Sequence, residues 1–151
     1  MRCGVDESRF RVCEVGMEIK ESLNEILHSK DEFGRMFYQH FLETYPELQH
    51  HFARVNMKRQ AVMLTTALMI IERYYSEATP AIELYLRFLG TKHHGLGVST
   101  GDFPKFFDSL FQTLKRFHGE KWHADLERQW RAAIEQATSL MFEGYIEHVQ
   151  V

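Results

Sequence analysis

Two polar side chains, His93 and Gln60, lie on helical faces that are otherwise apolar, and Tyr38 lies on a predicted core helix; residues of these types could serve a metal or a flat cofactor. His93 ends a row of apolar residues at helical spacing, Gln60 begins another such row, and Tyr38 lies among phenylalanines. Taken singly, each has an ordinary explanation: a core histidine bonded to backbone, a capping or exposed glutamine, and a packing tyrosine. A buried polar group left unpaired costs about 1–3 kcal/mol, so each of them needs a partner.

The helices that must position these side chains follow from apolar residues that recur at helical spacing. The pattern predicts six or seven helices, at about 14–28, 30–45, 46–52, 57–77, 79–95 and 100–117, followed by a long final helix after Gly119. Ser29 with Glu32, and Thr44 with Glu47, match the pattern of a capping box. Strand-like alternation is scarce, so the fold class is predicted to be all-α.

The composition fits an ordinary globular domain and excludes several function classes. The chain has 151 residues, a formal net charge of -3, 44% hydrophobic residues and 26% charged residues. Without a basic stripe, nucleic acid is not expected as the main partner. No apolar run approaches the roughly 20 residues of a membrane helix, and the first residues lack the apolar core of a signal peptide. We therefore expect a cytoplasmic protein that binds neither membranes nor nucleic acid.

Four sequence segments carry a resemblance to a known family. LGTKHHGLGV (89–98) resembles the proximal region of globins, and FYQHFLETYPELQHHF (37–52) resembles the matching stretch of bacterial single-domain globins and of flavohaemoglobin haem domains. QAVML (60–64) matches the start of their distal helix, and Trp130 fits a tryptophan of their last helix. The resemblance covers roughly residues 18–145 and implies a three-over-three globin fold around one haem b.

The resemblance assigns residues to the two sides of that haem. His93 would be the proximal iron ligand, with Phe52, Leu64, Val98 and Phe103 as further residues in contact with the cofactor. His94 is the rival ligand, but the apolar row and the five-residue distance to Val98 favour His93.

On the distal side, Tyr38, Gln60 and Leu64 would surround a diatomic gas at a pentacoordinate iron. Tyr38 can donate a hydrogen bond to the gas, and Gln60 can donate to it or orient Tyr38. Gly34 and Ala61 match small positions where two globin helices cross closely. The expected function is reversible, tight binding of O2, with NO and CO as further ligands.

Flavohaemoglobins suggest an alternative, the conversion of NO and O2 to nitrate. The 151 residues hold no flavin or nicotinamide domain, so an external reductase would be required. Flavohaemoglobin haem domains also carry a proximal Tyr and Glu that polarise the proximal histidine. Phe103 occupies the position of that Tyr, and Glu143 is the nearest candidate for the Glu. We therefore rank gas binding above catalysis, and a haem-based gas sensor remains a further alternative.

Other readings remain open at this point. Three Glu-x-x-His pairs, Glu25/His28, Glu47/His50 and Glu120/His123, would suit a di-iron four-helix bundle. Lys58 or a nearby histidine could occupy the sixth iron position of an electron-transfer globin. A helical interaction module without cofactor is the last alternative.

The first 17 residues lie outside the resemblance. We expect an N-terminal extension at 1–17, by default a plain tail, followed by a single globin domain at 18–151. Cys3 and Cys13, the only cysteines, are expected to be reduced thiols, with a redox-switchable link as the alternative. The oligomeric state is left open.

Overall fold

A computed structural model describes residues 2–5, 11–14 and 16–148 of the chain. In chain order, the described elements are β1 (Arg2–Val5), β2 (Arg11–Glu14), α1 (Ile19–His28), α2 (Lys30–Thr44), the 3-10 helix η1 (Pro46–Phe52), α3 (Met57–Ser76), α4 (Pro80–Gly95), α5 (Asp102–His118), the 3-10 helix η2 (Gly119–Lys121) and α6 (Ala124–Glu147). The prediction of an all-α fold is confirmed for the body of the molecule. The first helix begins at Ile19, later than the expected 14.

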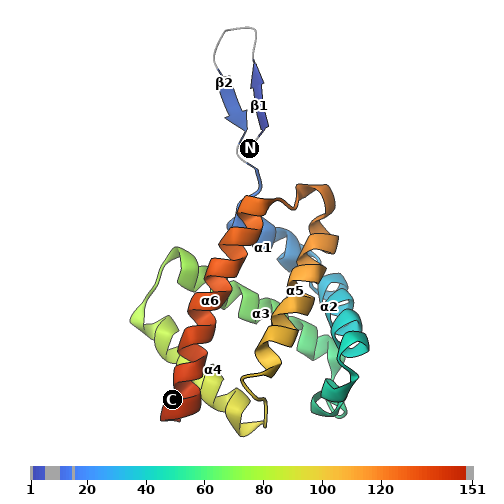
Figure 1. The fold of residues 1–151 in the computed structure, drawn as a ribbon, viewed down its shortest axis with the longest axis vertical. Helices are drawn as coiled ribbons and strands as arrows, with labels where there is room; N and C mark the ends of the chain where they lie inside the picture. Colours follow the sequence, from blue (N-terminus) through green and yellow to red (C-terminus); the bar gives the residue numbers. More distant parts are fainter. Residues whose placement is uncertain (1, 6–10, 15, 149–151) are drawn as a thin grey trace.

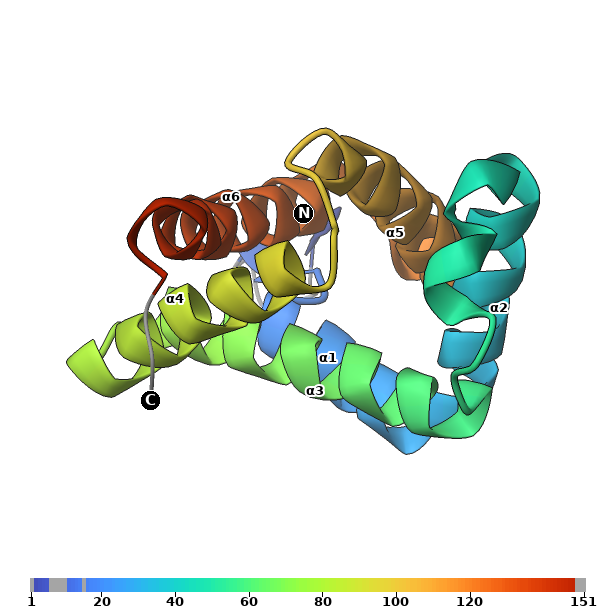
Figure 2. The ribbon, with the colours of Figure 1, turned by 90° about the horizontal axis from the view of Figure 1, so that it is seen from below.

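The helices form two layers around one core (Figures 1 and 2). Figure 2 shows α4 and α6 side by side, with α3 crossing beneath them and reaching α2 at its other end. None of the described helices has the length and apolar character needed to cross a bilayer.

Local signals explain where several helices begin. The Thr79 hydroxyl accepts a hydrogen bond from the amide of Ile82 at 3.4 Å, ahead of a proline in the first turn of α4. The capping box expected at Ser29 is wrong, because its side chain makes no capping bond. Its backbone N–H ends α1 instead, by bonding to the Ile26 carbonyl.

Two further caps differ from the expectation. Tyr45, not Thr44, precedes η1, and no side chain caps that helix, so the second capping box is wrong as well. Asn56 begins α3, where its side-chain oxygen accepts from the amides of Lys58 and Arg59 at 3.0 and 3.1 Å. This cap fixes the start of the helix that carries Gln60.

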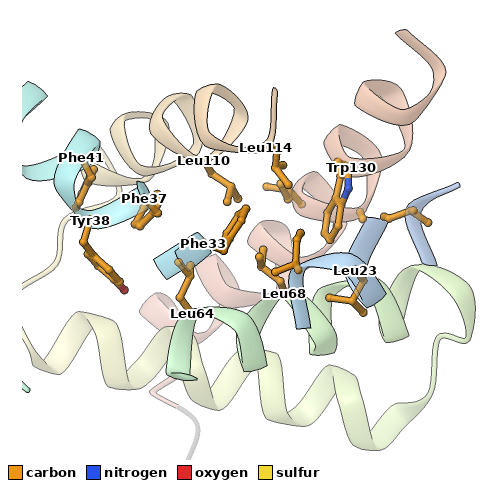
Figure 3. Packing of buried hydrophobic residues seen from close by; sticks show 14 of the residues in the cluster. Leu23, Phe33, Phe37, Tyr38, Phe41, Leu64, Leu68, Leu110, Leu114 and Trp130 are labelled. Carbon is orange, nitrogen blue, oxygen red and sulfur yellow. The ribbon is translucent and has the colours of Figure 1, made fainter. Parts of the chain in front are cut away.

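The core is a cluster of large apolar side chains from five α-helices and the 3-10 helix η1 (Figure 3). Its largest fully buried members include Trp130, Phe33, Phe37, Leu68, Leu110 and Leu114. Tyr38 lies at one end of this cluster, and its hydroxyl points away from α2. A fully buried Phe or Leu side chain contributes about 1.5–3 kcal/mol, so the cluster holds the helices that carry the polar residues in fixed positions.

Strands β1 and β2 form an antiparallel hairpin that projects from the helical body (Figure 1). A plain tail was the expectation for this region, and the structure differs. Four-residue strands of mixed polar and apolar residues are too short for alternation to be recognised. The assignment of residues 18–151 to a single domain stays a prediction.

A buried polar network joins α1, α5 and α6. The indole N–H of Trp130 donates to the Ser22 hydroxyl at 3.0 Å, and Ser22 Oγ lies 2.7 Å from Nε2 of His118. His118 Nδ1 lies 3.3 Å from a carboxylate oxygen of Glu25, which also pairs with Lys121. The carboxylate can only accept, so His118 Nδ1 donates to it and Nε2 accepts from Ser22. Since Ser22 is fully buried, the network serves to hold α1, α5 and α6 together.

This network predicts a stability that depends on pH. Burial lowers the pKa of His118 below 6.5, against the opposing effect of Glu25. The unfolded chain therefore binds a proton more readily, and the free energy of unfolding should fall as pH drops below about 6.5. The pKa of Glu25 is lowered too, with its largest cause in the bond from Lys121, so its contribution is lost only at pH below about 4.5.

Urea unfolding of the protein between pH 7 and 5 tests this. In His118→Gln the free energy of unfolding should depend less steeply on pH, because residue 118 no longer binds a proton. An unfolding free energy with the same pH slope in both proteins would contradict the assignment.

Candidate functional site

His93 lies in the last turn of α4, half-buried, with its ring orientation fixed by backbone. Its Nδ1 lies 2.8 Å from the carbonyl oxygen of Leu89, one turn earlier in the helix. A carbonyl only accepts, so Nδ1 carries the proton and Nε2 presents a lone pair. No described residue makes a hydrogen bond with Nε2. This is the state in which a neutral imidazole serves as a metal ligand, with its other nitrogen bonded to a backbone carbonyl.

The neighbouring His94 faces elsewhere. It is exposed, and its ring lies 5.1 Å from the rings of both Tyr145 and His148. The apolar row that favours His93 over His94 in the sequence agrees with this geometry.

The turn after His93 is closed by hydrogen bonds. The Val98 amide donates to the His93 carbonyl at 3.1 Å, and the Tyr145 hydroxyl donates to the Val98 carbonyl at 2.7 Å. Burial raises the pKa of Tyr145 to about 12, so this phenol keeps the proton that it donates. Tyr145 thus ties α6 to the segment that carries Val98. Sequence reasoning missed Tyr145, because nothing local distinguishes it from other tyrosines near a chain end.

Phe103 is buried, and its ring centroid lies 6.1 Å from that of His93. It offers His93 an apolar neighbour without a hydrogen-bonding group. Glu143, the nearest candidate for a polarising carboxylate, accepts from Nε of Arg87 at 2.6 Å instead. The group that accepts the orienting hydrogen bond of His93 is therefore the neutral carbonyl of Leu89.

Tyr38 of α2 and Gln60 of α3 are in contact with each other, away from His93. Gln60 Nε2 donates to the Tyr38 hydroxyl oxygen at 3.1 Å. Burial raises the pKa of Tyr38 to about 12, although the bond from Gln60 acts in the opposite direction. Tyr38 consequently stays protonated at neutral pH. Since its oxygen accepts from Gln60, its own O–H remains free to donate to another group.

The close crossing of α2 and α3 brings this pair together. A Cβ placed on Gly34 would lie only 2.3 Å from the Cβ of Ala61. The prediction that small residues stand at this crossing is confirmed. Gly34 lies one turn before Tyr38, and Ala61 follows Gln60, so the backbone contact sets the distance between the two polar side chains.

The two parts of the site are joined by aromatic rings. Tyr38 and His93 are connected through a continuous series of rings from α2 and α5: Phe37, Phe106, Phe107 and Phe103. Neighbouring centroids in this series are 4.8 to 6.1 Å apart. Phe52 lies next to Tyr38, with ring centroids 5.4 Å apart, and Leu64 is buried in the same cluster. An apolar wall of this kind suits a flat, largely hydrophobic cofactor.

A di-iron centre would need a cluster of metal-binding side chains. In the described part of the chain no group of three or more His, Cys, Asp or Glu side chains could hold a metal ion. The three Glu-x-x-His pairs therefore do not converge on a di-iron centre there. Lys58, a possible ligand of the sixth iron position, is exposed. A haem needs only one protein ligand to its iron, and the His93 imidazole, with Nδ1 bonded to the Leu89 carbonyl, is of a type that fits this role.

Comparisons with known proteins agree with this geometry. The family model for globins matches residues 35–141, which include Tyr38, Gln60 and His93. A flavohemoprotein of Candida norvegensis is 32% identical over 85 residues, which is 55% of this chain and 22% of the relative. The chain thus spans about a fifth of the length of that curated relative. The chain belongs to the globin family of haem proteins, and within it resembles the haem domain of flavohaemoglobins.

Proposed function

We propose that this globin binds O2 reversibly, with His93 as the only protein ligand of a pentacoordinate haem b iron and with Tyr38 as the donor to the bound gas. The observation that carries the proposal is the 3.1 Å bond from Gln60 to the Tyr38 oxygen, which leaves the phenol proton for a ligand. When bound, ferrous haem would supply an iron that takes one diatomic molecule.

Each of the chain's own residues has a separate part in this proposal. Leu89 holds the His93 ring so that Nε2 faces the cofactor. Tyr38 stabilises O2 through one hydrogen bond in an apolar surrounding, where such a bond is stronger than in water. Gln60 orients the Tyr38 hydroxyl, and Leu64 excludes water beside it.

The first test is the visible spectrum of the purified, reduced protein with and without CO. A five-coordinate ferrous spectrum that shifts on addition of CO is expected. A six-coordinate ferrous spectrum in the absence of gas would contradict an open site and favour an electron-transfer globin.

Removal of the Tyr38 hydroxyl should release O2 faster. One hydrogen bond to the ligand contributes about 1.4 kcal/mol, so Tyr38→Phe should raise the O2 dissociation rate about tenfold. Gln60→Leu should raise it less, because Gln60 acts through Tyr38. Stopped-flow displacement of O2 by CO measures both rates.

Tyr45→Phe is the matched control. Tyr45 directly follows α2, and its hydroxyl donates to the exposed Asp108 at 3.4 Å. The O2 dissociation rate of Tyr45→Phe should equal that of the unmodified protein. Equal dissociation rates in all four proteins would exclude Tyr38 and Gln60 as the distal pair.

A second candidate function is NO dioxygenation, in which NO, O2 and one electron give nitrate. The similarity to a flavohemoprotein favours it. The electron would come from a reductase. The apolar Phe103 beside His93 and the neutral Leu89 carbonyl give the imidazole little anionic character, so we rank this activity second. Nitrate formation from NO by the oxygenated protein with a supplied reductase would test it.

A further inference from the structure

The two cysteines of the chain occupy directly opposite positions in the N-terminal hairpin. Strands β1 and β2 are antiparallel, and their register pairs Cys3 with Cys13. The flanking partners are Gly4 with Val12 on one side and Arg2 with Glu14 on the other.

We propose that Cys3 and Cys13 are a redox-active pair, which closes to an intramolecular disulfide across the hairpin and reopens on reduction. Opposite residues of an antiparallel pair have Cα atoms about 4.5–5.5 Å apart. Disulfides span Cα distances of about 4.4–6.8 Å, so the backbone places the two positions within bonding range.

The chain beyond the hairpin is attached to the helical body. His123 caps α6 by accepting the Leu126 amide at Nδ1, so its Nε2 donates to the Met17 carbonyl at 2.9 Å. A Cβ on Gly16 would lie 2.8 Å from the same ring nitrogen. The crosslink would therefore stiffen a segment that is anchored at its C-terminal end beside α6.

The oxidation balances with a small disulfide such as oxidised glutathione. The thiolate of one cysteine attacks a glutathione sulfur, which forms a mixed disulfide and releases one glutathione thiolate. The thiolate of the other cysteine then displaces the second glutathione. The protein loses two electrons and two protons, and oxidised glutathione becomes two reduced molecules.

The test equilibrates the haem-loaded protein with mixtures of reduced and oxidised glutathione, blocks free thiols and measures mass. We expect a monomer that passes from two free thiols to none, without bound glutathione. Predominant glutathione adducts or disulfide-linked dimers would overturn the proposal.

A variant with shifted register shows whether the hairpin, and not mere proximity along the chain, is responsible. The double variant Val12→Cys with Cys13→Ser keeps two thiols and shortens the separation by one residue. In a flexible tail both pairs would close about equally well. In the hairpin the shifted cysteine lies opposite Gly4 and on the other face, so its effective concentration should fall by about tenfold or more. Equal closure of the two pairs would also overturn the proposal.

Discussion

Replacing His93 with Gly should remove the bond between the protein and the haem iron, whereas the same change at His94 should leave it intact. His93 is half-buried, and its free Nε2 is set by the 2.8 Å bond from Nδ1 to the Leu89 carbonyl. His94 is exposed and lies beside Tyr145 and His148. The two variants thus lose the same side chain at adjacent positions with different surroundings.

The expected loss is large because His93 is the only protein ligand in the proposal. Loss of a residue that merely supports a metal ligand costs 10–100-fold in affinity, so loss of the ligand itself should weaken haem binding by about 100-fold or more. Resonance Raman spectra of the ferrous proteins measure the iron–imidazole stretch directly. This band should be absent in His93→Gly and present in His94→Gly.

Free imidazole provides the decisive control. His93→Gly leaves space where the ring stood, so millimolar imidazole should restore a five-coordinate ferrous spectrum. A persistent iron–histidine band in His93→Gly, or its loss in His94→Gly, would assign the ligand to another residue and would end the proposed function.

The helical body could be predicted from the sequence because each helix buries one stripe of apolar residues. The expected ranges for α2, η1 and α3 agree with the structure to within one residue. The close crossing of α2 and α3 could also be predicted, since the small residues Gly34 and Ala61 lie near Tyr38 and Gln60 in the sequence. Family resemblance then pointed to His93, which periodicity alone left as one of several buried polar groups.

What the sequence did not predict depends on contacts between distant segments. The bond from Tyr145 to Val98 joins residues 47 positions apart and has no local signal. Helix caps failed for a related reason: Ser29 has the right residue type, but its backbone serves to end α1. The close contact of α4 with α6 was missed in the same way. A glycine inside each predicted helix, Gly90 and Gly144, was a signal that the two helices could approach closely.

The substitution Gly90→Ala should destabilise the protein and loosen the helix that carries His93. A Cβ on Gly90 would lie 1.8 Å from the Met141 carbonyl oxygen, and one on Gly144 would lie 1.9 Å from that of Arg87. The two glycines thus let the backbones of α4 and α6 touch. Thr91 fixes this contact by donating to the Gly144 carbonyl at 2.9 Å.

The clash should outweigh the better helix propensity of alanine. Overpacking costs about 1–3 kcal/mol, and the upper end applies because the atom in contact is backbone, which no side-chain rotation can move away. Alanine in a helix interior returns about 1 kcal/mol relative to glycine. We therefore expect a net loss of about 2 kcal/mol in the free energy of unfolding of Gly90→Ala, with faster haem loss because His93 follows three residues later.

Gly95→Ala is the matched control, since it makes the same change at the end of the same helix. A Cβ there would meet nothing within 4 Å, so the variant should unfold at the same or a slightly higher denaturant concentration than the unmodified protein. Guanidinium unfolding of the three ferric haem-loaded proteins compares them. If Gly90→Ala unfolds at the same guanidinium concentration as Gly95→Ala, α4 and α6 can separate at little cost. His93 would then not be positioned by the contact of α4 with α6.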